Sequence, residues 1–172
     1  MSLCIFFVAA TSQNPPIATS IVLGICSATM AVQTMIDLTT RRLPLPISLS
    51  ASLLMILAGG LVTRSAAQLL AMVSGGIAMM AIAHILVKVS RGSLGRGDVY
   101  FCLPLGVALG IGSNVLDTLS NAAYAWAITA LIGGVTACGG MLLRRVSKRS
   151  TIPYGPFLVV GTIAMLAIRG TP

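Results

Sequence analysis

Two aspartates are the residues of this chain whose type and position could support chemistry. The sequence has 172 residues and three acidic ones, which are Asp37, Asp98 and Asp117. Asp37 and Asp98 each lie where an apolar run meets a basic loop. Placing a carboxylate beside a membrane costs free energy, so its presence there usually indicates a function. Two such carboxylates can share one proton around a water molecule, which is how aspartic proteases hydrolyse peptide bonds.

Such a pair needs no metal and no cofactor. One carboxylate is ionised and takes a proton from the water, while the other is protonated and donates to the substrate carbonyl oxygen. The two groups titrate as a unit, and the sequence leaves open which aspartate is the base. Gly95 and Gly97 precede Asp98 and allow a loop whose backbone can approach an extended peptide closely.

Composition places these aspartates in an integral membrane protein. Apolar residues make up 56% of the chain and charged residues 8%, against about 25% charged residues in ordinary soluble domains. The mean hydropathy is +0.99. A helix needs about 20 apolar residues to cross a bilayer, so residues 1–172 have room for about six crossings in a single domain.

The basic residues and the cysteines have simpler explanations. The net charge is +8, but Lys and Arg form short clusters between apolar runs, as in loops that face anionic lipid. No basic stretch is long enough for a nucleic-acid footprint. None of the four cysteines is in a CxxC pair. We therefore expect buried small side chains rather than a disulfide framework or a zinc site.

Apolar runs and helix breakers predict six transmembrane helices. Residues 1–16 end in Asn14-Pro15-Pro16 and are expected not to span. With this layout nine basic residues fall on one side and two, Arg64 and Arg169, on the other. The bias supports an all-α bundle with both termini outside and the basic loops in the cytoplasm. The expected spans are 17–36, 46–63, 66–87, 98–112, 121–143 and 153–169.

This topology brings three features to the cytoplasmic face. Asp37 ends the first span, Asp98 begins the fourth, and the segment 152–157 begins the sixth. Asp117 lies on the opposite face, where we interpret it as a solvated loop residue. The topology therefore selects Asp37 and Asp98 as the catalytic pair.

The same three helix ends carry a family resemblance. The blocks are Asp37–Pro44, the Gly95-Arg96-Gly97-Asp98-Val99 run, and Pro153-Tyr154-Gly155-Pro156-Phe157. In this order they resemble the type IV prepilin peptidase family, which are membrane aspartic proteases with a GxGD motif. The third block is similar to that family's Pro-Phe-Gly-Pro-Phe. A lone GxGD motif would be weak evidence, whereas three blocks in order at matching helix ends are strong evidence.

The resemblance implies roles for individual residues. Asp37 and Asp98 would be catalytic, and Gly95 and Gly97 would form the active-site loop. A further set would position the substrate. Its members are Arg41, Arg42, Pro44, Arg96, Pro153, Tyr154, Gly155, Pro156 and Phe157.

The chain also departs from the family pattern. Leu45 stands where an asparagine is usual, and Tyr100 where a lysine often follows the GxGD valine. Larger members carry a tetracysteine insert and often N-methylate the new terminus, but this chain resembles the short forms without that insert. The residue before Asp37 is Ile36 and the chain has no Pro-Ala-Leu, so the related presenilin-type proteases are set aside.

The resemblance also implies substrates and a location. They are prepilins, pseudopilins or Flp-type pilins, cut on the cytoplasmic side of the inner membrane between a short basic leader and an apolar helix. Lipid is the other expected partner, and nucleic acid is not. Two alternatives stay open, a small proton-coupled transporter and a non-catalytic membrane protein of pilus or secretion assembly. A transporter would usually hold its carboxylates near mid-membrane.

Small and aromatic residues suggest packing roles. We expect the Gly106–Gly110 GxxxG and the glycine pairs at 59–60, 75–76, 133–134 and 139–140 to allow close helix packing. Trp126 and Tyr124 are expected to be anchors at the outer membrane interface.

Overall fold

The fold is known from a computed structural model that describes residues 17–40, 45–89, 95–142 and 154–170. These residues form helices and no strand, which confirms the expected all-helical class for the described part of the chain. The helices are α2 (Ile17–Thr40), α3 (Leu45–Thr63), α4 (Ala66–Val89), α5 (Arg96–Gly110), α6 (Val115–Leu142) and α7 (Gly155–Gly170).

Several predictions fall outside this description. They concern residues 1–16, Arg41, Arg42, Pro44 and Pro153. For Asp37 and Arg96 the helical backbone is described and the side chain is not.

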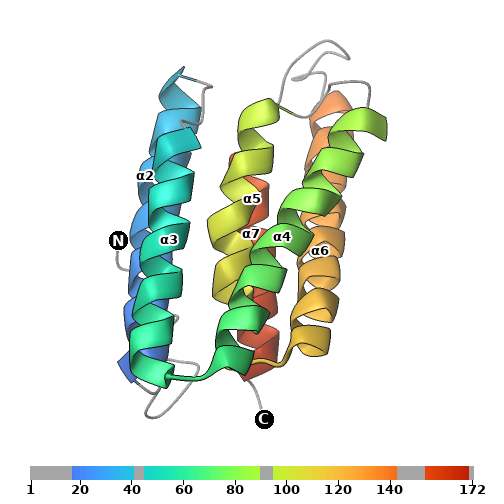
Figure 1. Ribbon diagram of the computed structural model, residues 1–172. Helices are drawn as coiled ribbons and strands as arrows, with labels where there is room; N and C mark the ends of the chain where they lie inside the picture. The colour runs from blue at the N-terminus through green and yellow to red at the C-terminus, as the bar shows by residue number, and fades with distance from the viewer. Residues whose placement is uncertain (1–16, 41–44, 90–94, 143–153, 171–172) are drawn as a thin grey trace.

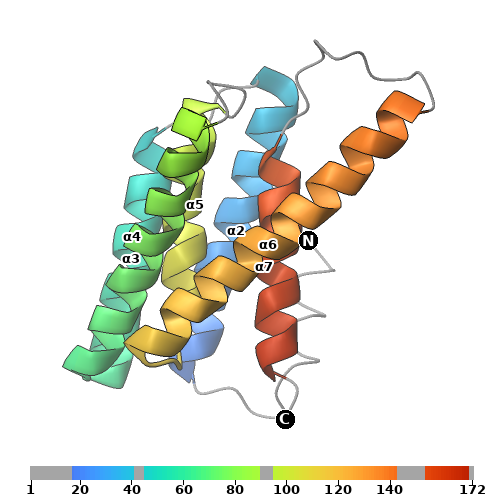
Figure 2. The ribbon, with the colours of Figure 1, turned by 90° about the vertical axis from the view of Figure 1, so that its right-hand side faces the viewer.

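The helices run up and down in one bundle (Figure 1). α2 begins and α7 ends at the lower end of this view, while α4 rises to the upper end where α5 begins. α2 packs on α3, α4 on α5, and α6 on α7. α6 leans across α7 and its C-terminal part leaves the bundle, as Figure 2 shows.

α5 is the central helix. It contacts each of the other five described helices, and most of its side chains from Asp98 onward are buried. It has 15 residues, which corresponds to about 22 Å at 1.5 Å per residue. α4, with 24 residues, is longer by about 13 Å on the same measure.

Glycines bring α4 and α5 into backbone contact. A Cβ on Gly106 would collide with the carbonyl of Gly75 and lie 2.8 Å from the Gly76 Cα, while a Cβ on Gly110 would collide with the backbone at Ala71. This confirms the expected packing role of Gly106, Gly110 and the pair at 75–76. The contact sets one antiparallel register for the two helices.

The lower end of α5 is capped by side chains from two other helices. Arg169 of α7 donates to the Leu109 carbonyl at 2.9 Å and also to the Ile111 carbonyl. Gln68 of α4 donates to the Gly110 carbonyl at 2.7 Å and accepts from the Gly112 N–H at 3.2 Å. Gly112 has φ +67, which favours glycine at this turn. These bonds satisfy carbonyls that a helix leaves unpaired at its end.

The bundle has large apolar side chains outside and several polar ones inside. Leu57, Leu61, Leu70 and Leu131 are among the exposed ones, while Gln33, Ser48, Thr118, Thr129 and Thr162 are buried. Two helical segments, Ala66–Val89 and Val115–Gly139, are long and apolar enough to cross a membrane. Such an apolar exterior is typical of a surface that meets another apolar phase.

The structure corrects the prediction for Asp117. α6 starts at Val115, six residues earlier than expected, so Asp117 lies in the first helical turn instead of a loop. Its backbone N–H donates to the Asn114 side-chain oxygen at 2.8 Å, and its carboxylate accepts from the Asn114 amide at 2.8 Å. Asn114 thus provides the helix cap that the sequence interpretation missed. Asp117 is exposed, as expected.

The lean of α6 overturns two smaller expectations. A Cβ on Gly134 or Gly139 would meet nothing within 4 Å, so these glycines do not serve helix packing. Cys26 and Cys102 are buried as expected, but Cys138 on the departing part of α6 is exposed.

We predict that Gly106→Ala and Gly134→Ala have opposite effects on stability. At position 106 the added methyl forces α4 and α5 apart, and overpacking of this kind costs about 1–3 kcal/mol. At position 134 it enters open space, where alanine in a helix is more stable than glycine by about 0.5–1 kcal/mol. Thermal unfolding of the purified variants in one detergent measures both changes. Equal melting temperatures for the two variants would contradict the assigned α4–α5 contact.

Candidate active site

Three helix ends converge where the sequence places its three blocks. The C-terminal end of α2 and the N-terminal ends of α5 and α7 lie at the upper end of the bundle (Figure 1). α2, α5 and α7 also contact one another pairwise. The backbone positions of Asp37, Asp98 and Tyr154 are therefore gathered at one end of three helices in contact.

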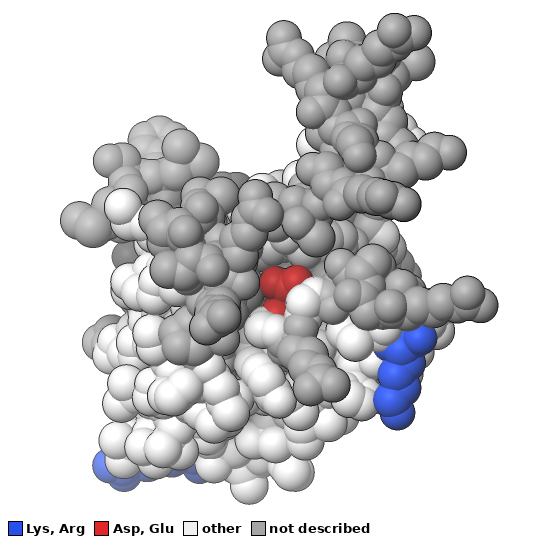
Figure 3. Space-filling model, turned by 90° about the horizontal axis from the view of Figure 1, so that it is seen from above, with Lys and Arg blue, Asp and Glu red and all other residues white. Residues whose placement is uncertain are grey.

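Asp98 is held in the first turn of α5. Gly95 is the N-cap residue, and its carbonyl accepts a hydrogen bond of 3.1 Å from the Asp98 N–H. The side chain is only 7% exposed. Seen from above, acidic atoms lie in a recess near the centre of this face (Figure 3). A carboxylate at a helix N-terminus is stabilised in its ionised form by the helix dipole.

Gly95 leaves room for the Asp98 carboxylate. A Cβ at position 95 would lie 3.3 Å from one carboxylate oxygen and 3.9 Å from the carboxylate carbon. The backbone there is extended, with φ −67 and ψ 142, so glycine is not required by its dihedral angles. A larger residue at position 95 would fill the space next to the Asp98 carboxylate.

The register of α4 and α5 sets the depth of Asp98. Gly110 is opposite Ala71, and Gly106 is opposite Gly75. Extended toward the start of α5, this antiparallel pairing brings Asp98 level with Ala83, six residues before α4 ends at Val89. Six helical residues correspond to about 9 Å. Asp98 therefore lies below the rim formed by α4.

Aromatic side chains form a cluster between α6 and the start of α7. The Tyr154 ring is stacked on Trp126, with centroids 6.4 Å apart and an interplanar angle of 25°. It also meets the Phe157 ring edge-on at 6.1 Å. Gly133 of α6 lies against both rings, because a Cβ there would be 3.5 Å from Tyr154 and 3.8 Å from Phe157. The Tyr154 ring is thus held between α6 and α7.

The third block starts α7 just past Tyr154. The N–H groups of Phe157 and Leu158 donate to the Tyr154 carbonyl at 3.1 and 3.2 Å. Pro156 lies in this first turn, where its missing N–H costs no helical bond and its fixed φ suits the helix. The block therefore begins a helix and turns its first aromatic residue toward α6.

A buried polar pair lies one turn below Asp37. The Gln33 amide donates to the Ser48 hydroxyl at 3.0 Å, and both side chains are fully buried between α2 and α3. Position 33 is four residues before position 37, so the two positions share a face of α2. A buried hydrogen bond of this kind fixes the rotation of α2 against α3.

The structure thus gathers the segments that carry Asp37, Gly95, Gly97, Asp98 and Tyr154. It adds three residues that the sequence interpretation missed, which are Trp126, Gln33 and Ser48. Trp126 was expected at the outer membrane interface, and this is wrong because it is only 4% exposed and donates to the Met79 carbonyl at 3.3 Å. Tyr124 is exposed, and its place at the outer membrane interface stays a prediction. The polar Gln33 inside an apolar run was the one available sequence signal.

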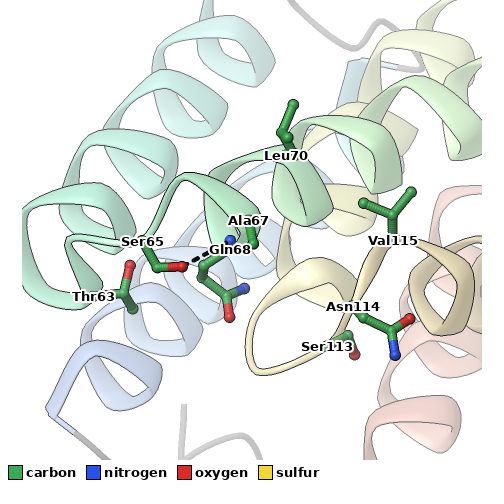
Figure 4. A pocket seen from close by; sticks show the side chains of 8 residues that line it. All are labelled: Thr63, Ser65, Ala67, Gln68, Leu70, Ser113, Asn114 and Val115. Carbon is green, nitrogen blue, oxygen red and sulfur yellow. Dashed lines mark hydrogen bonds between the residues drawn. The ribbon is translucent and has the colours of Figure 1, made fainter.

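A second hollow lies at the opposite end of the bundle (Figure 4). It is formed where α3 meets α4 and where α6 begins, and it lies far along the helices from Asp98. Its lining is Thr63, Ser65, Ala67, Gln68, Leu70, Ser113, Asn114 and Val115. Within the described ranges, no three His, Cys, Asp or Glu residues lie close enough to hold a metal ion.

Comparison with known proteins gives one match. The family model described as the type IV leader peptidase family matches residues 21–138. No curated protein and no solved structure is significantly similar to the chain. The matched segment includes Asp37, Asp98 and the helices between them. This confirms the resemblance inferred from the three blocks.

We predict that Tyr154→Ala exposes Trp126, the single tryptophan of the sequence. Loss of the stacked ring opens a path for solvent, so the tryptophan emission shifts to longer wavelength and acrylamide quenches it more strongly. Tyr124→Ala is the matched control, because Tyr124 is exposed on the same helix and its loss leaves the emission unchanged. A tryptophan anchored at the membrane interface would respond to neither variant.

Proposed function

Because this chain belongs to the type IV leader peptidase family, we propose that it cleaves the leader of prepilin-like proteins with a catalytic pair formed by Asp37 and Asp98. The family implies a protease; the pair and its mechanism are our proposal. One observation carries it: α2, α5 and α7 are in mutual contact, and the helix ends next to the three sequence blocks lie at the same end of the bundle as buried Asp98.

Helix polarity suggests how the two aspartates divide the chemistry. Asp98 lies at the N-terminal end of α5, where the dipole favours a negative charge. Position 37 is in the last turn of α2, where the dipole disfavours one. We therefore assign the ionised, water-activating role to Asp98 and the protonated, carbonyl-polarising role to Asp37.

The apolar exterior supports a bundle embedded in the inner membrane. Charged side chains are few, and the large exposed side chains of α3, α4 and α6 are mainly Leu, Ile and Val. Together with the excess of basic residues that the sequence has between α2 and α3, between α4 and α5, and between α6 and α7, this supports six spans with the site facing the cytoplasm.

A site at this boundary suits prepilins, pseudopilins and Flp-type pilins. Their cleaved bond lies between a basic leader in the cytoplasm and an apolar helix in the bilayer. Asp98 lies about 9 Å below the rim of α4 by the helical rise, so the scissile segment would enter the recess in extended form. We propose peptidase activity alone, because residues 1–172 contain no CxxC pair of the family's tetracysteine insert.

We predict that Asp37→Asn and Asp98→Asn each abolish cleavage. Each variant removes one member of the proton-sharing pair, and loss of a general acid or base typically costs about 10²–10⁴-fold in rate. The assay uses purified chain and a peptide with a basic leader ending in glycine, followed by an apolar segment. Product formation is followed by mass spectrometry.

Asp117→Asn is the matched control. Asp117 is exposed at the far end of the bundle, so its loss should leave cleavage unchanged, and excess EDTA should have no effect because the mechanism uses no metal. Near-wild-type turnover by either Asp37→Asn or Asp98→Asn would refute the catalytic pair.

We further predict that Gly95→Ala lowers kcat with little change in KM. The new methyl would lie 3.3 Å from a carboxylate oxygen of Asp98, so the carboxylate must move by a few tenths of an ångström. Catalytic geometry is sensitive to such shifts, and we expect a loss of about three- to tenfold. Gly24→Ala is the control, because a Cβ there meets nothing within 4 Å. Equal kcat for both variants would mean that position 95 does not constrain the carboxylate.

A further inference from the structure

We infer that Gln33 and Ser48 are positioning residues, whose buried hydrogen bond sets the register of α2 against α3 and thereby the place of Asp37 in the catalytic pair. The inference rests on the proposed function and extends it to two side chains that lie outside the three sequence blocks. Both residues act through the backbone of α2 rather than on the reacting atoms.

The bond between the two side chains is reciprocal. The Gln33 amide donates to the Ser48 hydroxyl at 3.0 Å, and this hydroxyl donates to the Gln33 amide oxygen at 3.2 Å. Both side chains have 0% exposure. A buried amide that loses its partner cannot replace the lost hydrogen bond with one to water. Any slide or rotation that separates the two side chains is therefore unfavourable.

A second contact between α2 and α3 gives the same register. A Cβ on Gly59 of α3 would lie 3.8 Å from a side-chain methyl of Val22 on α2. Gln33 follows Val22 by eleven residues, and Ser48 precedes Gly59 by eleven residues. Eleven residues make about three helical turns and span about 16 Å, so both contacts join the same two helix faces. One more turn along this antiparallel register reaches Asp37.

The apolar residues of α3 do not select this register by themselves. Leu49 and Leu53 are exposed, whereas Ser48 and Ser52 are buried. In the membrane location that we propose, lipid solvates a leucine as well as another helix does. Ser52 donates to the Ser48 carbonyl of its own helix at 2.7 Å. A polar bond across the interface supplies the discrimination that hydrocarbon packing lacks, as one buried polar residue does in coiled coils.

The register matters for Asp37 because this residue lies one turn beyond Gln33. Four helical residues correspond to a rotation of about 40° and a rise of about 6 Å, so position 37 stays on the face of α2 that contains buried Val22 and Cys26. α2 ends at Thr40. A slip by one residue rotates the helix by about 100° and would turn position 37 away from that face.

The first test replaces the polar pair by an apolar pair. In Gln33→Met/Ser48→Ala no buried polar partner is left alone, so the thermal unfolding temperature should stay close to that of the wild type. Because the register is no longer selected, we expect kcat to fall about tenfold and KM to change less than about twofold. Ser52→Ala is the matched control and should leave both constants unchanged.

Gln33→Leu/Ser48→Ala repeats this comparison with another apolar residue, so that a folding failure of one double variant leaves the other. Wild-type kcat in a folded double variant overturns the inference.

The second test needs no activity. Val32 of α2 and Leu61 of α3 are exposed, so nitroxide labels on cysteines at these positions report the register by pulsed electron paramagnetic resonance, in a chain whose native cysteines are replaced by alanine. Gln33→Met/Ser48→Ala should broaden the distance distribution or shift it by at least about 1.5 Å, the rise of one residue. Ser52→Ala should leave the distribution unchanged.

An unmoved distribution in the double variant overturns the inference, whatever the rate of cleavage. If the wild type fails to cleave the leader peptide but the distribution moves, the proposed function fails and the role of the Gln33–Ser48 bond in the register stands.

Discussion

The backbone contact between α4 and α5 is the constraint on which this structure depends. Gly75 and Gly106 let the two helices touch without side chains between them. Because α5 has no bulky side chains on this face, the five other described helices can all pack around it. A helix enclosed in this way must satisfy its end groups within the protein, and Arg169 and Gln68 do so at its lower end. At its upper end, α5 carries Asp98 at a level below the end of α4. The depth and the burial of the Asp98 carboxylate follow from this one helix–helix register.

Helix polarity makes this end of the bundle electrically asymmetric. The N-terminal ends of α5 and α7 bring partial positive charge, and the C-terminal end of α2 brings partial negative charge. Two carboxylates placed among these ends experience different fields even before they interact. A pair that shares one proton works best when the pKa values of the two carboxylates differ, so that the proton resides mainly on one of them. In the catalytic pair that we propose, the alternation of helix direction thus supplies an acid–base difference that neither aspartate has by itself.

The sequence predicted what depends on local pattern. The six helices of the described residues, the ends carrying Asp37, Asp98 and Tyr154, and the packing role of Gly106 follow from apolar runs, charges and small residues. Contacts between distant residues were missed. Trp126 was misplaced because an aromatic residue in an apolar run looks the same whether it faces lipid or a neighbouring helix. Asp117 was misplaced because the helix-capping role of Asn114 was overlooked. The Gln33–Ser48 bond required knowing which faces of α2 and α3 meet.

The missed contacts have a common physical basis. In the membrane location that we propose for this bundle, burying hydrocarbon gives helices little reason to associate, so small-residue packing and hydrogen bonds must determine which faces meet. The Gln33–Ser48 pair, the Trp126–Met79 bond and the Arg169 cap each join two helices through a polar group. The polar residue of each contact lies within or at the end of an apolar run, so in the sequence it is an exception to the apolar pattern. For a bundle of this kind, such exceptions identify the helix faces that meet, because a polar group in the apolar interior requires a partner.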